Sequence, residues 1–193
     1  MQHICVYCAS NPGVRPAYVQ AARDLGALIA ARGATVVYGG GRVGLMGALA
    51  DGALQAGGKV IGVMPHALVE REAAHQSLTE LHIVNSMHDR KAMLATLADG
   101  YIALPGGIGT LEELFETWTW AQLGVHNKPI GMLNVANYWN TMTQFFEQMG
   151  NEGFLRSHTR ELVLIDDNAT NLLQRMEDHV PPTVTQWVAL PEA

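Results

Sequence analysis

The sequence feature that most constrains the fold is a glycine-rich segment at residues 104–113, which reads LPGGIGTLEE. It follows an apolar run at residues 101–103 and opens an amphipathic segment. This order predicts a strand, a glycine turn and a helix that begins near Leu111. The three glycines are expected to allow positive φ angles and to leave room for a ligand, which the first free N–H groups of the helix would face. A turn of this kind favours an anion such as phosphate.

The same segment also has a purely structural interpretation. Thr110 is followed three residues later by Glu113, which is the spacing of a capping box, in which each side chain bonds the other residue's backbone N–H. Local sequence alone does not separate a capping carboxylate from a catalytic one. The rest of the chain must decide between the two interpretations.

Composition restricts the class of protein. The 193 residues suffice for one domain with a substantial core, and we expect a single domain over residues 1–193. Hydrophobic residues make up 48% and charged residues 16%, which is typical of a globular chain and not of a disordered one. The formal net charge of -6 argues against a general nucleic-acid binder, so we expect phosphate binding to be local and directed at a small molecule.

Targeting signals, metal ligands and redox motifs are weak in this chain. The first residues lack the basic segment and long apolar core of a signal peptide, and no apolar run approaches membrane-spanning length, so we expect a cytoplasmic protein without membrane contact. The eight histidines show no ligand spacing, and neither a metal nor a cofactor is inferred. Cys5 and Cys8 form a C-x-x-C motif inside an apparent strand, where this spacing points their side chains to opposite faces. Buried structural cysteines are favoured over a redox pair.

Strand and helix patterns alternate along the chain. The predicted strands are residues 3–9, 35–38, 59–64, 81–84, 101–103, 130–135 and 162–165. The predicted helices are residues 17–32, 48–56, 87–98, 111–123, 138–149 and 168–179, while residues 66–80 are expected to form a loop or short helix over the site. This alternation predicts an α/β fold, a Rossmann-like doubly wound parallel sheet with helices on both faces.

A second glycine-rich segment, residues 39–47, lies between a predicted strand and a helix. Gly39, Gly41 and Gly44 satisfy the dinucleotide fingerprint G-x-G-x-x-G, but no acidic residue for a ribose follows at the end of the next strand. We interpret the segment as a second wall of a mononucleotide pocket, with close helix–strand packing as the structural alternative. Arg42 is either a phosphate contact or a solvated side chain.

Two cations occupy an unusual position. Ser86 and Asp89 form a capping box, so Arg90 and Lys91 fall in the first turn of a helix, where the macrodipole disfavours positive charge. A nearby anion would compensate, and two solvated side chains are the alternative. Ligands of doubly wound sheets bind at the carboxyl ends of the strands. The elements that fall there are Ser10, residues 39–41, Arg90 with Lys91, and residues 106–110.

Two motifs together resemble a known family. Residues 105–113 match P-G-G-x-G-T-x-x-E, and residues 87–91 match M-H-x-R-K, the signatures of the LOG ("lonely guy") cytokinin riboside 5′-monophosphate phosphoribohydrolases. With residues 39–47 the resemblance covers nearly the whole chain. Proteins of this family are often labelled lysine decarboxylases, yet Lys59, Lys91 and Lys128 have no context that resembles a pyridoxal-phosphate site.

The resemblance implies hydrolysis of the N-glycosidic bond of a nucleoside 5′-monophosphate, which releases an adenine-type base and ribose 5-phosphate. It implies Arg90 and Glu113 as the catalytic pair, no cofactor, and a homodimer. Combined with the strand-end argument, the candidate substrate-binding residues are Ser10, Gly40, Gly41, Glu72, Met87, Lys91, Gly106, Gly107, Ile108, Gly109, Thr110, Leu111, Glu112 and Thr119.

The implied chemistry suits these residue types. Cleavage of a ribosyl C–N bond passes through an oxocarbenium-like state, which a carboxylate such as Glu113 can stabilise, or it can activate the attacking water. A phosphate and a carboxylate in one pocket repel each other by about 4 kcal/mol at contact distance and surface-like dielectric. Arg90 is therefore predicted to bridge Glu113 and the substrate. The sequence identifies no general acid for the departing base.

Other functions stay open at this point. The substrate is either a cytokinin nucleotide or AMP. A nucleotide-binding carrier or sensor without turnover is a second class, although phosphate binding alone would not need both Arg90 and Glu113. An NAD-dependent oxidoreductase is a third, disfavoured by the missing ribose acid. Candidate dimer contacts are residues 118–120 and 139–149, and the tail at 183–193, which holds Trp187, either packs on a neighbour or frays.

Overall fold

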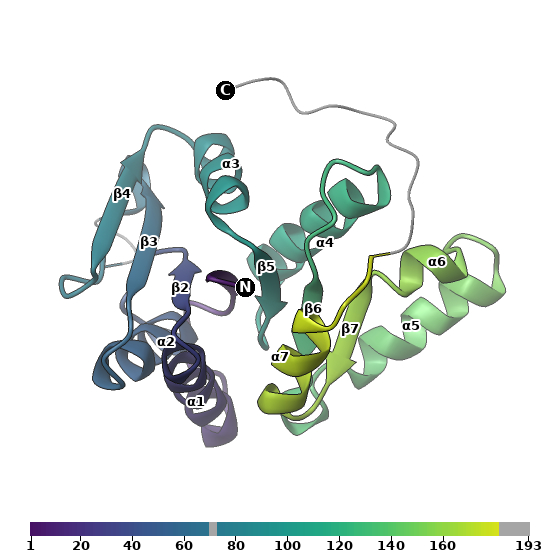
Figure 1. Ribbon diagram of the computed structural model, residues 1–193, viewed down its shortest axis with the longest axis horizontal. Coiled ribbons are helices and arrows are strands. Elements are labelled where there is room, and N and C mark those ends of the chain that lie inside the picture. The colour runs from purple at the N-terminus through teal and green to yellow at the C-terminus, as the bar shows by residue number, and fades with distance from the viewer. Residues whose placement is uncertain (70–72, 182–193) are drawn as a thin grey trace.

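The computed structural model describes residues 1–69 and 73–181 of the chain. Its described residues form one seven-stranded sheet in the order β4-β3-β2-β1-β5-β6-β7, and every neighbouring pair of strands is parallel. The strands are β1 His3–Tyr7, β2 Thr35–Tyr38, β3 Val60–Pro65, β4 Glu80–Val84, β5 Gly100–Ala103, β6 Ile130–Leu133 and β7 Val163–Asp166. The predicted α/β, Rossmann-like fold is confirmed (Figure 1).

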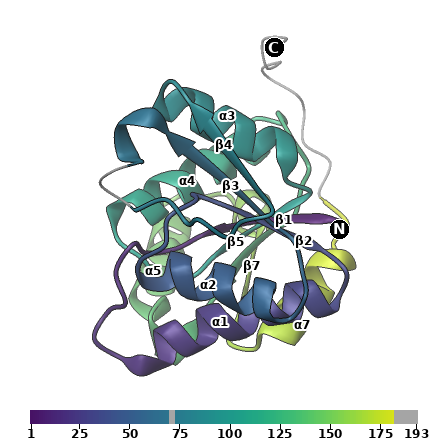
Figure 2. The same ribbon diagram turned by 90° about the vertical axis from the view of Figure 1, so that its left-hand side faces the viewer.

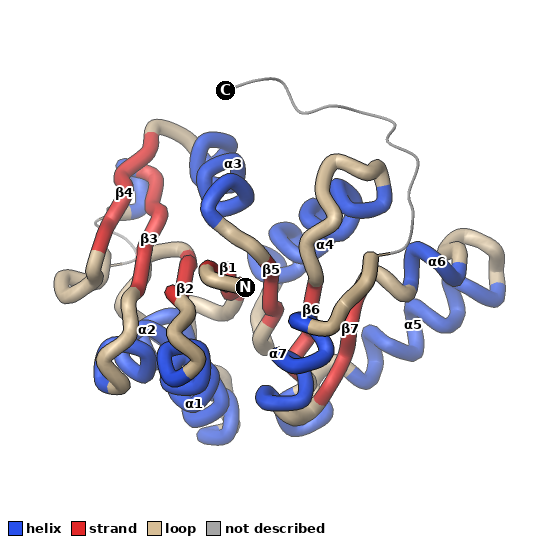
Figure 3. Tube along the Cα trace, viewed as in Figure 1, coloured by secondary structure: helices blue, strands red, loops and turns tan. Residues whose placement is uncertain are grey.

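Helices cover both faces of this sheet (Figures 2 and 3). One face packs against α1 Pro16–Ala31, α2 Gly44–Gln55 and α7 Ala169–Glu177. The other packs against α3 Met87–Leu97, α4 Ile108–Gln122 and α5 Asn140–Asn151. The short helix α6 Ser157–Arg160 and the single-turn 3₁₀ helices η1 His66–Leu68 and η2 Val135–Asn137 complete the described elements. Because strand side chains alternate between faces, the two hydrophobic cores lie on opposite sides of β1.

The start of α4 differs from the sequence prediction. The helix begins at Ile108 with Gly107 as its N-cap, and no side chain caps it. Thr110 therefore lies within the first turn and Glu113 in the second, so the structural alternative, a Thr110–Glu113 capping box, is wrong. The reason is that Gly107 takes an extended conformation with φ −94° and accepts the Leu111 N–H at 3.1 Å, which starts the helix three residues earlier. Positive φ angles occur instead at Gly40 and Gly44 of the other glycine segment.

Ser86 caps α3, as the sequence predicts. The Ser86 hydroxyl oxygen accepts the Asp89 N–H at 3.1 Å, and the same hydroxyl donates to Asp89 Oδ2 at 2.8 Å. This cap fixes the first turn of α3, and with it the positions of Arg90 and Lys91. Within the described residues, no helix combines the length and the apolar character needed to cross a membrane.

The two cysteines are buried free thiols. Cys5 packs in the core on the α3–α4 side and Cys8 in the core on the α1–α2 side, so the predicted opposite orientation is confirmed. Burial raises the pKa of both thiols and withholds the reactive thiolate. We therefore expect slow reaction with a disulfide reagent in the native protein and release of two equivalents after unfolding in guanidinium. Rapid titration of either thiol in the folded protein would contradict this burial.

Candidate active site

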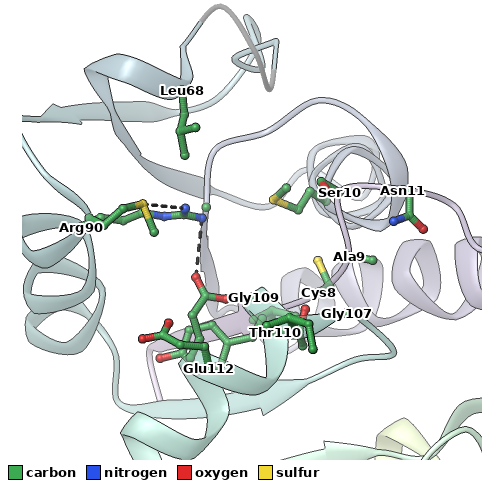
Figure 4. A pocket seen from close by; sticks show the side chains of 17 residues that line it. Cys8, Ala9, Ser10, Asn11, Leu68, Arg90, Gly107, Gly109, Thr110 and Glu112 are labelled. Carbon is green, nitrogen blue, oxygen red and sulfur yellow. Dashed lines mark hydrogen bonds and ion pairs between the residues drawn. The ribbon is translucent and has the colours of Figure 1, made fainter.

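A cavity of about 340 Å³ opens at the carboxyl edge of the sheet, next to the ends of β1 and β2 and the starts of α3 and α4. Figure 4 shows labelled residues from the segment after β1, from the segment after β3 and from the starts of α3 and α4 around it. The predicted site residues that line this cavity are Ser10, Met87, Arg90, Gly107, Ile108, Gly109, Thr110, Glu112 and Glu113. The strand ends and the two helix starts therefore meet in one cavity, as the strand-end rule led us to expect.

Other predicted residues do not line the cavity. Gly40 and Gly41 are buried behind it, where the Gly40 carbonyl accepts the His75 N–H at 3.0 Å. Leu111 packs against the core on the α3–α4 side. The Thr119 hydroxyl donates to the Phe115 carbonyl of its own helix at 2.7 Å. Glu72 lies outside the described residues.

Gly106 lies directly under the side chain of Thr110. A Cβ placed on Gly106 would come within 2.1 Å of Thr110 Oγ1, so a larger residue would displace the buried threonine. Gly106 lines a smaller neighbouring cavity that shares Ala9, Asn11 and Gly107 with the first. The Tyr138 hydroxyl donates to the Gly106 carbonyl at 2.6 Å and holds the turn from outside.

Arg90 is buried although it is charged. Its side chain is 8% exposed and its Nη2 lies 3.7 Å from Glu113 Oε1, an ion pair slightly longer than a hydrogen bond. Nη1 contacts the sulfur of Met87 at 3.8 Å, and Nε has no hydrogen-bond partner among the described residues. A buried guanidinium with unused donors is costly unless a ligand completes its hydrogen bonds.

Gly39 makes room for this guanidinium. A Cβ on Gly39 would meet Arg90 Nη2 at 2.1 Å and the Met46 sulfur at 3.2 Å. Only glycine therefore lets the end of β2 lie directly against Arg90. Sequence reasoning found Gly39 as part of a fingerprint and missed this role.

Lys91 faces away from the cavity. Its Nζ donates to Glu112 Oε1 at 2.7 Å and to Glu116 Oε1 at 2.9 Å, and the bond with Glu112 is the main cause that raises the pKa of Lys91. The two α4 carboxylates thus compensate this cation in the first turn of α3. These ion pairs explain why a positive charge is tolerated at Lys91 near the start of a helix. Arg90, next to it, lines the cavity instead.

The N-terminus of α4 forms the opposite wall. Leu111 donates to Gly107, so the N–H groups of Ile108, Gly109 and Thr110 precede the helical hydrogen-bond ladder. An added Cβ on Gly107 or on Gly109 would meet nothing within 4 Å, which shows open space above both. Free N–H groups at the positive end of a helix make an anion site.

Several lining residues were missed from the sequence. No motif distinguishes Asn11, and Met46 and Leu68 lie in segments expected at the site, residues 39–47 and 66–80, without being singled out there. Residues 1–69 and 73–181 contain no group of three or more His, Cys, Asp or Glu side chains placed to hold a metal ion. The charged side chains among the lining residues are Arg90, Glu112 and Glu113.

Comparison with known proteins agrees with these motifs. A family profile described as "Possible lysine decarboxylase" matches residues 46–176. The chain is 44% identical over 181 residues to the probable cytokinin riboside 5′-monophosphate phosphoribohydrolase LOGL5 of Oryza sativa subsp. japonica, covering 94% of this chain and 74% of that protein. It is 43% identical over 180 residues to the cytokinin riboside 5′-monophosphate phosphoribohydrolase LOG1 of Arabidopsis thaliana, covering 93% and 84%.

Solved structures share the fold at lower identity. The molybdenum cofactor binding protein from Rippkaea orientalis matches with a TM-score of 0.67 and 23% identity, over 92% of this chain and 96% of that one. This likeness concerns the fold alone.

The decarboxylase description finds no support in the cavity. Lys91 is held by Glu112 and Glu116, and Lys128 Nζ donates to the Ala95 carbonyl at 2.7 Å. Neither lysine is among the lining residues. The identities over nearly the whole chain are decisive: the chain belongs to the LOG family of cytokinin riboside 5′-monophosphate phosphoribohydrolases.

Proposed function

We propose that this protein hydrolyses the N-glycosidic bond of nucleoside 5′-monophosphates, cytokinin riboside 5′-monophosphates in the first place, and releases the free base and ribose 5-phosphate. The observation that carries the proposal is the buried Arg90–Glu113 pair, which lines the same cavity as the open N-terminus of α4. The names of the relatives agree with this reaction.

The geometry suggests a division of roles. The phosphate would bind the N–H groups at the start of α4, where partial positive charge favours an anion. Glu113, one turn further along that helix, would face the ribose and stabilise the oxocarbenium-like state or take a proton from the attacking water. The water oxygen bonds to C1′ as the C1′–N bond breaks, and the base leaves with the bonding electron pair and acquires a proton.

Arg90 would hold the two anionic groups together. The Nε without a partner and the long 3.7 Å contact to Glu113 leave donors available for a substrate oxygen. Among the charged side chains that line the cavity, Arg90 is the cation, and the other two are the carboxylates of Glu112 and Glu113. Bridging by Arg90 offsets the repulsion between the carboxylate and a phosphate-bearing substrate.

The cavity also has an apolar side that suits a base with an apolar N6 substituent. Leu68, Met87 and Ile108 line it, and Met87 and Ile108 remain 44% and 83% exposed. AMP is the second candidate substrate, because it offers the same ribose and phosphate. We infer a cytoplasmic enzyme that acts on small nucleotides and not on nucleic acid.

A homodimer belongs to the same proposal. Of the predicted contact residues, Trp118 and Trp139 are buried within the protomer, where the Trp118 indole donates to the Thr159 carbonyl at 2.8 Å. Met87, Ile108 and Phe115 are exposed, and the first two line the cavity, so these three residues are better candidates for the contact. Light scattering that gives the mass of a monomer at working concentration would contradict this assignment.

The test is a comparison of substrates. The purified protein is incubated with AMP and, separately, with N6-isopentenyl-AMP, and the free base is followed by chromatography. We expect base release, faster from the isopentenyl compound because Leu68, Met87 and Ile108 can bury its side chain. Binding of both nucleotides without base release would instead establish a carrier or sensor.

A further inference from the structure

We infer that Asn11 selects for the 5′-phosphate of the substrate, with its side-chain amide as a neutral hydrogen-bond donor at the α4 end of the cavity. The inference rests on the proposed nucleotide-binding function and assigns a residue outside both sequence motifs. Asn11 lines the candidate active site and, together with Gly107 and Ala9, also lines the neighbouring cavity. It therefore stands next to the start of α4, where the phosphate is proposed to bind.

A local turn decides which end of the Asn11 amide is available. The Gly13 N–H donates to Asn11 Oδ1 at 3.2 Å, and Gly13 adopts φ +66° to close this turn. The oxygen is thereby occupied, so Nδ2 with its two hydrogens is the atom left for a ligand. In Figure 4 this nitrogen lies on the Ser10 side of the amide, away from the oxygen.

The backbone that carries Asn11 is held between the two glycine segments. The Ala9 carbonyl accepts the N–H groups of Leu45 and Met46 at 3.1 and 3.3 Å, and the Ala9 N–H donates to Pro105 at 3.4 Å. Gly44 packs so closely that an added Cβ would lie 2.4 Å from the backbone nitrogen of Asn11. The amide donor is thus positioned in advance relative to the α4 N-terminus.

The charges of the cavity explain why a neutral donor is useful there. Its charged lining residues are Arg90, Glu112 and Glu113, and each is already paired: Arg90 with Glu113 at 3.7 Å, and Glu112 with Lys91 at 2.7 Å. A phosphate dianion must therefore be bound largely by dipoles: backbone N–H groups and a side-chain amide. A further negative charge at position 11 would oppose binding directly.

The decisive variant is Asn11→Asp. Aspartate keeps an oxygen for the Gly13 N–H and so retains the turn, but it replaces the donor by an anion. We expect the KM for the nucleotide to rise about ten- to hundredfold with a smaller change in kcat, and calorimetry to show a matching loss of AMP affinity. Affinity for adenosine, which has no phosphate, should stay within about twofold of wild type.

A matched control is Asn168→Asp. Asn168 Oδ1 accepts the Asn171 N–H at 3.0 Å at the start of α7, so this change also keeps a capping oxygen and adds one negative charge, outside the cavity. It should leave the KM unchanged. An Asn11→Asp protein that binds AMP like wild type, or that loses AMP and adenosine equally, would overturn the inference.

Failure of the proposed reaction can be told apart from failure of this assignment. If wild type binds AMP but releases no base, the hydrolase proposal fails, and the calorimetric comparison of AMP with adenosine still tests Asn11. If wild type binds neither AMP nor N6-isopentenyl-AMP, Asn11 has no phosphate to select and the inference is overturned as well.

Discussion

Replacing Glu113 with glutamine is expected to lower kcat by about 10²- to 10⁴-fold while the nucleotide still binds. The amide keeps the shape of the side chain but cannot carry the negative charge that stabilises an oxocarbenium-like state or accepts a proton. Because Glu113 lies in the second turn of α4 and not at its cap, the start of the helix should not depend on it. Activity is measured by base release, and binding by calorimetry with AMP.

The matched control for this prediction is Glu116→Gln. Glu116 lies on the same helix, pairs with Lys91 at 2.9 Å and does not line the cavity. Its replacement should leave turnover close to wild type, since Lys91 keeps Glu112 as a partner. A Glu113→Gln protein that retained turnover but melted at a lower temperature would assign Glu113 a structural role instead.

The second large effect is expected from Gly39→Ala, a change of one methyl group. The new Cβ would overlap Arg90 Nη2, at 2.1 Å, and must displace the guanidinium from its place beside Glu113. Because small misplacements of catalytic groups are costly, we expect kcat/KM to fall by about a hundredfold or more. The measurement is steady-state base release, with circular dichroism to verify the fold.

Gly150→Ala serves as the control for the glycine substitution. Gly150 lies in α5, and an added Cβ would meet only the Leu155 carbonyl at 3.7 Å, an ordinary contact. This variant should be as active as wild type and slightly more stable, because alanine favours a helix. If Gly39→Ala were equally active, Arg90 would not need its observed position, and its bridging role would be lost.

Much of the fold follows from hydrophobic periodicity. The strand at Thr35–Tyr38 is predicted to the residue, and the helix predicted before it is followed by Gly33 with φ +74°, a conformation that ends helices. Alternation along β1 also places Cys5 and Cys8 correctly on opposite faces. Local patterns suffice here because burial and backbone preference agree.

The errors arise where glycine leaves the backbone undetermined. At the start of α4, the spacing of Thr110 and Glu113 allowed a cap at Thr110, whereas the N-cap in the structure is Gly107. The consequence for function is direct, since it removes the capping explanation of Glu113. Sequence spacing likewise could not tell that Lys91 turns to Glu112 while its neighbour Arg90 enters the cavity.

The contributions of Gly39, Leu68 and Asn11 come from tertiary structure. No motif marks Leu68, which lies in the short helix after β3. Gly39 matters because the guanidinium of Arg90 packs directly against it. Such contacts depend on which strands are neighbours in the sheet. Motifs can name the chemical groups, but not the residues that shape the space around them.

The most direct test of the central claim is the stoichiometry of products from a cytokinin riboside 5′-monophosphate, with wild type and Glu113→Gln compared side by side. We expect wild type to release one free base for each ribose 5-phosphate formed, and the variant to bind the nucleotide but to release almost no base. Equal product formation by both proteins, or no product from wild type, would contradict catalysis by the Arg90–Glu113 pair.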